Sequence, residues 1–145
     1  MKKILERIGI GLLILFSVLF FGPWLLNLFG IVSYKPPMSQ NPENVVQVDF
    51  LEYTKGESRI LHSLTEEEIA PFMEVFLELD AKRYANDPST EYGQWVVRLC
   101  YADGGYDLLG GMVEFFSSTG ESINSRGWYY LPRSDLEELF AKYVP

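Results

Sequence analysis

The sequence has few residues of the types that build disulfides, zinc sites and imidazole chemistry. Its 145 residues include one cysteine, Cys100, and one histidine, His62. A lone cysteine excludes an internal disulfide and a cysteine-based zinc site. It also excludes lipid attachment after the N-terminal apolar run, because no cysteine follows that run directly. A single histidine likewise excludes a metal site built from several imidazoles. The fold is therefore expected to be stabilised by its apolar core alone.

Basic residues are also scarce. The chain has 12 Lys and Arg against 20 Asp and Glu, a net charge of −8. Residues 1–32 hold three of the basic side chains and one of the acidic, which leaves 9 basic and 19 acidic residues, a net charge of −10, for the remainder. Such a surface repels phosphate backbones and anionic headgroups, so we expect no binding of nucleic acid. An acidic surface favours the binding of metal cations, basic peptides or a basic protein surface. Solvated surfaces that bind nothing are also commonly acidic, which is the alternative.

Residues 8–32 form the longest apolar run, in which Asn27 is the one strongly polar side chain. As a single helix of about 25 residues it would span roughly 38 Å, more than a bilayer core of about 30 Å. Pro23 lacks the N–H that the helical ladder needs, so we expect the helix to cover about residues 4–21 and to break there. Trp24 would then lie at headgroup depth. The apolar residues that follow either lie along the interface or form a kinked continuation.

The residues that flank this run predict its orientation. Three basic residues precede it, whereas only Lys35 follows closely, so we expect a cytoplasmic N-terminus and an outward C-terminal domain. A cleaved signal would end at a small-x-small site after about 7–15 apolar residues. The best cleavage positions, after Gly30 or Ser33, have Leu28 or Ile31 where a small residue is needed. We therefore expect an uncleaved single-pass anchor in the cell membrane, with a cleaved signal as the alternative.

The chain divides into three parts. Residues 1–32 are the cytoplasmic tail and the transmembrane or signal-anchor segment. Residues 33–43 contain three prolines with Ser, Gln and Asn, a composition typical of an extended, semi-rigid stalk. Residues 44–145 form an extracytoplasmic domain, which is long enough to bury one modest core.

Periodicity predicts how this domain begins. Apolar residues alternate along residues 44–53, a turn follows, and residues 58–64 read as a returning strand, so we expect a hairpin. Val46, Val48 and Phe50 are expected on one face of the first strand. Thr65 and Glu68 then have the spacing of a capping box, which begins a helix whose apolar face continues to about residue 83.

Residues 92–132 are rich in aromatic and branched side chains and are punctuated by turn signals at residues 103–105, 110–111 and 118–120. This pattern predicts a three-strand meander, with Gly110 and Gly111 marking a bulge or bend inside the second strand. Val97, Leu99 and Tyr101 share one face of the first strand with Trp95, and Val96, Arg98 and Cys100 share the other.

A second capping box, from Ser134 to Glu137, begins the closing helix. The predicted order is β(β)αβββα. This order predicts an α+β domain of two layers, an antiparallel sheet of about 4–5 strands with two helices on one face.

No combination of polar residues predicts catalysis. His62 and Cys100 are the sole members available for a Cys–His pair, and a cysteine inside a strand is usually a small buried hydrophobe. Asp103 and Asp107 flank a Gly-Gly-Tyr turn, but a calcium loop needs about five regularly spaced oxygen donors, so a tight hairpin turn is the simpler interpretation. We therefore expect no metal, no cofactor and no enzymatic activity.

Acidic residues also follow the first predicted helix. Glu67, Glu74 and Glu78 form a stripe, and Glu78 is placed to pair with Lys82 at i,i+4. A solvated helix face is the usual explanation. A hydrolase would need two carboxylates at a defined separation, and nothing in the sequence places such a pair.

The predicted meander is crowded with Tyr, Trp and Phe, and only one of its faces can be covered by the helices. We take Tyr101, Tyr106 and Tyr129 as a candidate binding surface, since outward aromatic rings stack on sugars or anchor a protein partner. Core packing and ordinary cross-strand pairing are the alternative.

These observations favour a single-pass membrane-anchored envelope protein. Its outward acidic domain is expected to act as a protein-interaction or accessory module, with a partner in the membrane or the envelope. The alternative is a ligand-binding or cell-wall glycan-binding module that uses the sheet aromatics. A secreted hydrolase, released after signal cleavage, is the least favoured hypothesis.

Overall fold

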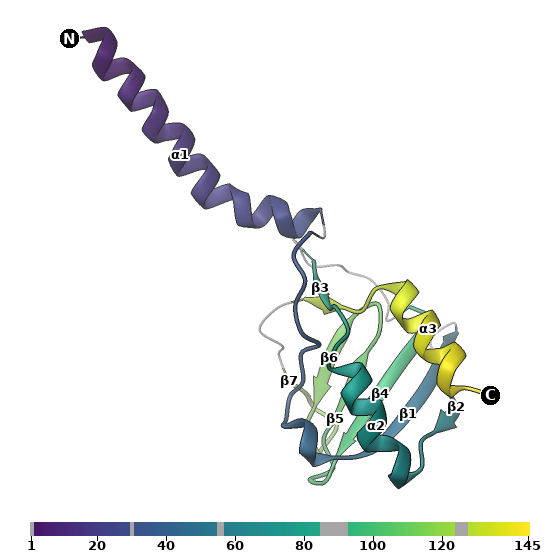
Figure 1. The fold of residues 1–145 in the computed structure, drawn as a ribbon. Helices are drawn as coiled ribbons and strands as arrows, with labels where there is room; N and C mark the ends of the chain where they lie inside the picture. Colours follow the sequence, from purple (N-terminus) through teal and green to yellow (C-terminus); the bar gives the residue numbers. More distant parts are fainter. Residues whose placement is uncertain (1, 30, 55–56, 85–92, 124–127) are drawn as a thin grey trace.

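The computed structural model describes residues 2–29, 31–54, 57–84, 93–123 and 128–145. Within these ranges the chain forms a long N-terminal helix, α1 (Lys2–Leu28), and an α+β domain (Figure 1). In chain order the elements of the domain are η1 (Pro42–Asn44), β1 (Val45–Thr54), β2 (Glu57–Ser63), α2 (Glu66–Phe76), β3 (Lys82–Arg83), β4 (Trp95–Tyr101), β5 (Tyr106–Leu109), β6 (Val113–Phe116), β7 (Ser122–Ile123), β8 (Tyr129–Tyr130) and α3 (Arg133–Tyr143).

Helix α1 continues through Pro23, so the expected break at this residue is wrong. The helix instead changes direction before its C-terminal end (Figure 1), which is the kinked continuation. Asn27 Nδ2 donates to the Pro23 carbonyl at 3.0 Å, within the last turns of the helix. The stretch Ile8–Leu28 has a mean hydropathy of 2.3 and is long and apolar enough to cross a membrane, a character that signal sequences share.

The main sheet has more strands than expected. Its six strands lie in the order β2-β1-β4-β5-β6-β7, and every neighbouring pair is antiparallel. A small second sheet pairs β3 with β8. Gly110 and Gly111 lie between β5 and β6, so they form a turn rather than a bulge inside a strand. The predicted three-strand meander is therefore a four-strand meander, because this turn divides its second strand.

The predicted hairpin of β1 and β2 is confirmed. The expected alternation along β1 is wrong at its start, because a bulge between Val45 and Gln47 shifts the register against β4. Val45 thereby joins Val48 and Phe50 in the core, whereas Val46 is 55% exposed. A bulge of one residue moves every earlier side chain to the opposite face.

The capping box of α2 is confirmed. The Glu68 carboxylate accepts a hydrogen bond from the backbone N–H of Thr65 at 2.8 Å, and the Thr65 side chain is the reciprocal acceptor for the backbone N–H of Glu68. The helix ends at Phe76 rather than near residue 83. Beyond it the chain turns back, and Ala81 forms an antiparallel bridge with Tyr34. Pairing with a distant segment thus overrides the helical periodicity, which local sequence alone does not reveal.

Two further local predictions change as a result. Glu78 lies outside α2 and pairs with Lys35 at 3.0 Å, so its expected helical pair with Lys82 does not form. Helix α3 begins at Arg133 with Pro132 as its N-cap residue, so Ser134 lies inside the first turn and the second capping box is wrong. Proline suits this position because the first N–H groups of a helix have no intrahelical partner.

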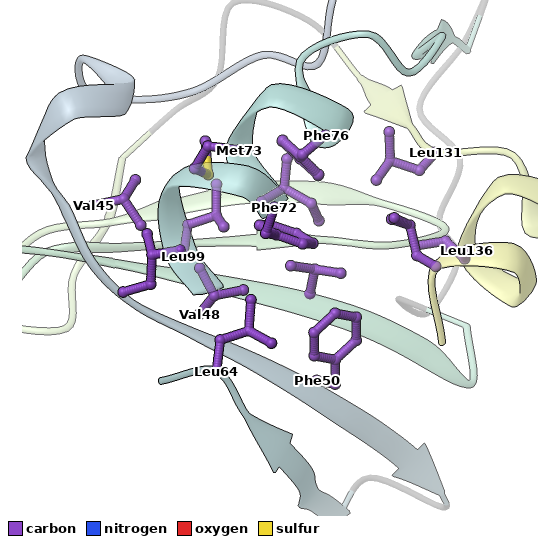
Figure 2. Close-up of a cluster of buried hydrophobic side chains, with 14 of the residues drawn as sticks. Val45, Val48, Phe50, Leu64, Phe72, Met73, Phe76, Leu99, Leu131 and Leu136 are labelled. Atoms are coloured by element: carbon purple, nitrogen blue, oxygen red, sulfur yellow. The ribbon is translucent and has the colours of Figure 1, made fainter. Parts of the chain in front are cut away.

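Helices α2 and α3 pack against the same face of the main sheet (Figure 1), which we call the inner face. Phe50 lies near the centre of this core, with its ring 4.9 Å from that of Phe140 and 5.7 Å from those of Phe72 and Tyr143. Figure 2 shows the side chains that close around it from both helices and the sheet.

Residues 33–43 lie along the domain, and we call them the strap. Tyr34 and Ala81 exchange two backbone hydrogen bonds of 2.8 Å, and Pro36 is buried. Gln40 Nε2 donates to Asp103 at 2.8 Å, beside the turn that follows β4. Through these contacts the strap packs against the domain along its length. It therefore attaches the end of α1 to the domain as well as separating the two.

Candidate functional site

The face of the main sheet opposite α2 and α3, the outer face, has an ion pair at its centre. Asp49 on β1 is 0% exposed, and Arg98 on β4 donates to its Oδ2 through Nε at 2.9 Å and through Nη2 at 2.5 Å. Ser63 Oγ donates to Oδ1 at 2.6 Å, and Gln47 Nε2 reaches both oxygens at 2.9 and 3.0 Å. Three strands therefore converge on a single carboxylate.

Burial alone would raise the pKa of Asp49, but the hydrogen bonds from Gln47, Ser63 and Arg98 and the charge of Arg98 hold the pKa below its ordinary value. The carboxylate is thus ionised at neutral pH. Donors from the three strands occupy both oxygens of the Asp49 carboxylate. We therefore assign it a structural role, in which it stabilises the register of these strands.

Apolar residues continue the outer face beside this pair. Leu51, Val96 and Leu108 are buried, with Tyr53, Tyr106 and Phe116 packed against them. The rings of Tyr106 and Phe116 are stacked, with centroids 4.7 Å apart and planes 11° apart. The outer face therefore presents half-buried aromatic rings next to a charged pair.

A groove of about 660 Å³ opens between α2 and the segment that leads into β1. Its residues are Pro42, Glu43, Val45, Val46, Glu66, Ile69, Ala70, Met73, Glu74 and Leu77. The lining is mostly apolar, and its charged members are three glutamates. We call this feature the acidic groove.

A third polar feature lies under the inner face. Asp107 on β5 is fully buried and accepts hydrogen bonds from the Tyr101 hydroxyl and from the strap, where Ser39 donates its backbone N–H at 2.8 Å and its hydroxyl at 2.5 Å. Burial raises the pKa of Asp107 against the effect of these donors, and burial also raises the pKa of Tyr101. The arrangement attaches the strap to the core through one carboxyl group.

The three tyrosines of the candidate binding surface lie in different places. Tyr101 is 2% exposed on the inner face, so its ring does not reach the surface. Tyr106 lies on the outer face. Tyr129 lies on β8, half-buried against the main core, with the ring of Tyr34 edge-on at 5.5 Å and the guanidinium of Arg83 at 5.8 Å. The fold does not bring the three rings onto one surface.

The other candidate residues are also separated. Cys100 lies opposite Gln47 and Tyr106, whereas His62 lies opposite Phe50, whose side chain is in the inner core, so the two are on different faces of the sheet. Burial raises the pKa of Cys100, which keeps the thiol protonated.

The two aspartates of the turn differ in their roles. Asp103 accepts hydrogen bonds from Gln40 Nε2 and from the Gly105 N–H, both at 2.8 Å, and these bonds lower its pKa. Asp107 faces the inner core, as described above. Both carboxylates therefore accept hydrogen bonds from the strap, and Asp103 also accepts one within the turn. We interpret both residues as structural.

Only some of the features missed by the sequence analysis have a signal in the sequence. Asp49 and Arg98 are charged residues inside strongly apolar strands, which is a sign of a buried pair, but their partnership depends on the register of β1 against β4. The acidic groove joins residues about two dozen positions apart and has no local motif. In comparisons with family models, curated proteins and solved structures, no match to this chain was found, so its function is argued from these surfaces alone.

Proposed function

We propose that the protein is a membrane-anchored interaction module whose acidic groove holds an apolar, Lys- or Arg-bearing segment of a partner protein. The observation that supports this is the composition of the groove. Ile69, Met73 and Leu77 supply an apolar lining, while the charged side chains around it are all glutamates. A segment with apolar and basic residues would bury its apolar side chains and place its cations against the glutamates.

The position of the groove suits such a role. It is formed by α2 and the η1–β1 segment, which lie at the end of the domain remote from α1 (Figure 1). If α1 is the anchor, the groove faces away from the membrane surface. The strap contacts described above would hold it in that orientation, so a partner would meet a preorganised site.

The proposal is tested by placing a photo-crosslinking amino acid at Ala70, a small exposed residue of the groove, in the full-length protein in native membranes. We expect one discrete protein adduct. Glu66→Lys with Glu74→Lys should reduce its yield by about fivefold or more, because two exposed attractive charge pairs become repulsive.

The matched control carries the crosslinker at Ser58, an exposed position on β2 outside the groove. The adduct should be absent there. An adduct of equal yield from both positions, or a yield at Ala70 that survives the double charge reversal, would contradict the groove as the binding site.

A second candidate function, glycan or ligand binding, is supported by the stacked Tyr106–Phe116 pair on the outer face. Tyr106→Ala is then expected to abolish retention of the full-length protein on purified cell wall, with the circular dichroism spectrum unchanged. Tyr129→Ala is the control, because Tyr129 lies on β8 and not on the outer face. Equal retention of the two variants and the unchanged protein would exclude this function.

A further inference from the structure

A small pocket lies where α1 meets the β3–β8 sheet, and we call it the junction pocket. It has a volume of about 170 Å³ and is lined by Trp24, Asn27, Arg83, Tyr84 and Trp128. Trp24 and Trp128 are both 44% exposed. Two exposed indoles from segments about a hundred residues apart therefore border the same space, together with a guanidinium.

Specific contacts hold the junction together. The Tyr34 hydroxyl donates to Asn27 Oδ1 at 2.8 Å, which ties the last turns of α1 to the strap. Lys82 Nζ donates to Ser33 Oγ at 2.6 Å, and Arg83 lies in β3 against the Tyr129 ring. Within the part of the chain that the structure describes, neither Lys82 nor Arg83 forms an ion pair.

We propose that the junction pocket lies in the lipid headgroup layer and that Arg83 binds the phosphate of an anionic phospholipid there. This inference rests on the proposed membrane anchoring of α1. Trp24 follows directly on the most apolar part of the helix, where an indole favours headgroup depth. Because Trp128 borders the same pocket, it must lie at nearly the same depth.

The chemistry of the pocket agrees with this occupant. Arg presents a planar fork of donors that matches phosphate, and indoles combine an apolar body with one N–H. The pocket is formed by residues next to the helix end, so a headgroup beside α1 would reach it without any movement of the domain.

The junction also differs in charge from the rest of the domain. Residues 33–145 carry a net charge of −10, which repels an anionic membrane surface. At the junction, Lys82 and Arg83 are adjacent and form no ion pair with any acidic residue that the structure describes. Basic residues close to an anionic surface are attracted to it. Attraction at this corner and repulsion elsewhere would orient the domain, with the acidic groove directed away from the lipid.

The three tryptophans of the chain allow a direct test. Full-length variants are made in which two of Trp24, Trp95 and Trp128 are replaced by Phe, and each is reconstituted into phosphatidylcholine vesicles with or without phosphatidylglycerol. Lipids brominated near the headgroup quench the emission of a nearby indole. We expect quenching of Trp24 and Trp128, stronger for Trp128 with phosphatidylglycerol, and little quenching of Trp95, which packs against Phe140 in the domain.

Arg83→Glu should weaken the lipid contact of Trp128 in phosphatidylglycerol vesicles by roughly fivefold or more, the effect expected for a basic residue at an anionic surface. Arg59→Glu is the matched control, since Arg59 is an exposed residue of β2. This substitution should leave the quenching of Trp128 unchanged.

The outcomes separate the inference from the anchor. Quenching of Trp24 without quenching of Trp128 would overturn the junction pocket as a lipid site and leave the anchoring intact. Absence of quenching for both would overturn the anchoring as well. Quenching of Trp128 that is insensitive to phosphatidylglycerol and to Arg83→Glu would overturn phosphate recognition.

Discussion

Replacing Arg98 by methionine is expected to lower the free energy of unfolding of the domain by about 3 kcal/mol at neutral pH, because it leaves the fully buried Asp49 carboxylate without its cation. We place the value at the lower end of the range for buried pairs, since the Arg98 side chain is 29% exposed and water screens part of the interaction. This change in the free energy of unfolding is measured by urea unfolding of the full-length protein in detergent, monitored by near-ultraviolet circular dichroism.

The loss should depend on pH. In the unchanged protein the pKa of Asp49 is below its ordinary value, so the stability that this group contributes is present above that value and is lost as the pH falls through the folded-state pKa. Without Arg98, its hydrogen bond and its charge no longer lower the pKa of Asp49, so this pKa should be higher than in the unchanged protein. The difference in stability between the two proteins should therefore shrink as the pH falls.

Two comparisons identify the cause. Adding Asp49→Leu to Arg98→Met removes the unpaired charge and should restore most of the stability, as for other buried pairs replaced by apolar residues. Arg133→Met is the control, because Arg133 pairs with Glu137 on the exposed side of α3 and should contribute less than about 0.5 kcal/mol. If Arg98→Met were no more damaging than Arg133→Met, the pair would have no structural role.

The sequence predicted those parts of the fold that depend on neighbouring residues. The β1–β2 hairpin and the capping box of Thr65 and Glu68 are confirmed because the turn and the cap involve residues close in the chain. The α+β class followed from the order of such elements. The number of strands did not. The turn at Gly110 and Gly111 divides one predicted strand of the main sheet into β5 and β6. The second sheet consists of β3 and β8, two-residue strands that exist only through their mutual pairing.

The errors arise where distant contacts override a local pattern. Apolar spacing continues beyond Phe76, yet α2 ends there because the chain turns back to pair with Tyr34. Of the two alternatives expected after Pro23, α1 forms the kinked continuation, because a helix loses only one hydrogen bond and gains one bend at an internal proline. For α2 the apolar spacing was interpreted correctly, and the end of the helix depended on a contact with a distant segment.

The candidate sites were harder to predict than the fold for the same reason. Tyr101 was expected at the surface because the face of β4 that the helices cover cannot be identified from β4 alone. Asp49 and Arg98 are 49 residues apart, and Ser39 and Asp107 are 68 apart. No pattern of spacing links such partners, so they are found only when the register of the strands and the path of the strap are known.

The second large effect is expected at Asp107. Asp107→Ala should lower the free energy of unfolding by about 3 kcal/mol, because it leaves a cavity and removes the acceptor of the buried Tyr101 hydroxyl and of the Ser39 N–H. It should also release the strap, which limited proteolysis within residues 33–43 would detect. Asp103→Asn is the matched control, since Asp103 also binds the strap, through Gln40, but at an exposed position. Equal behaviour of the two variants would contradict the role of Asp107.

Asp107→Asn is expected to have the opposite effect at neutral pH, because an amide reproduces the protonated carboxyl. Its oxygen can accept from Tyr101 and from the Ser39 N–H, while its NH₂ donates to the Ser39 hydroxyl. The folded-state pKa of Asp107 is raised, so its stabilisation is fully present below the unfolded value of about 3.9 and is lost as the pH rises through the folded-state pKa. The unchanged protein should therefore lose stability over that interval relative to Asp107→Asn. Parallel stability curves for the two proteins would contradict a raised folded-state pKa of Asp107, whereas curves that diverge with rising pH would support it.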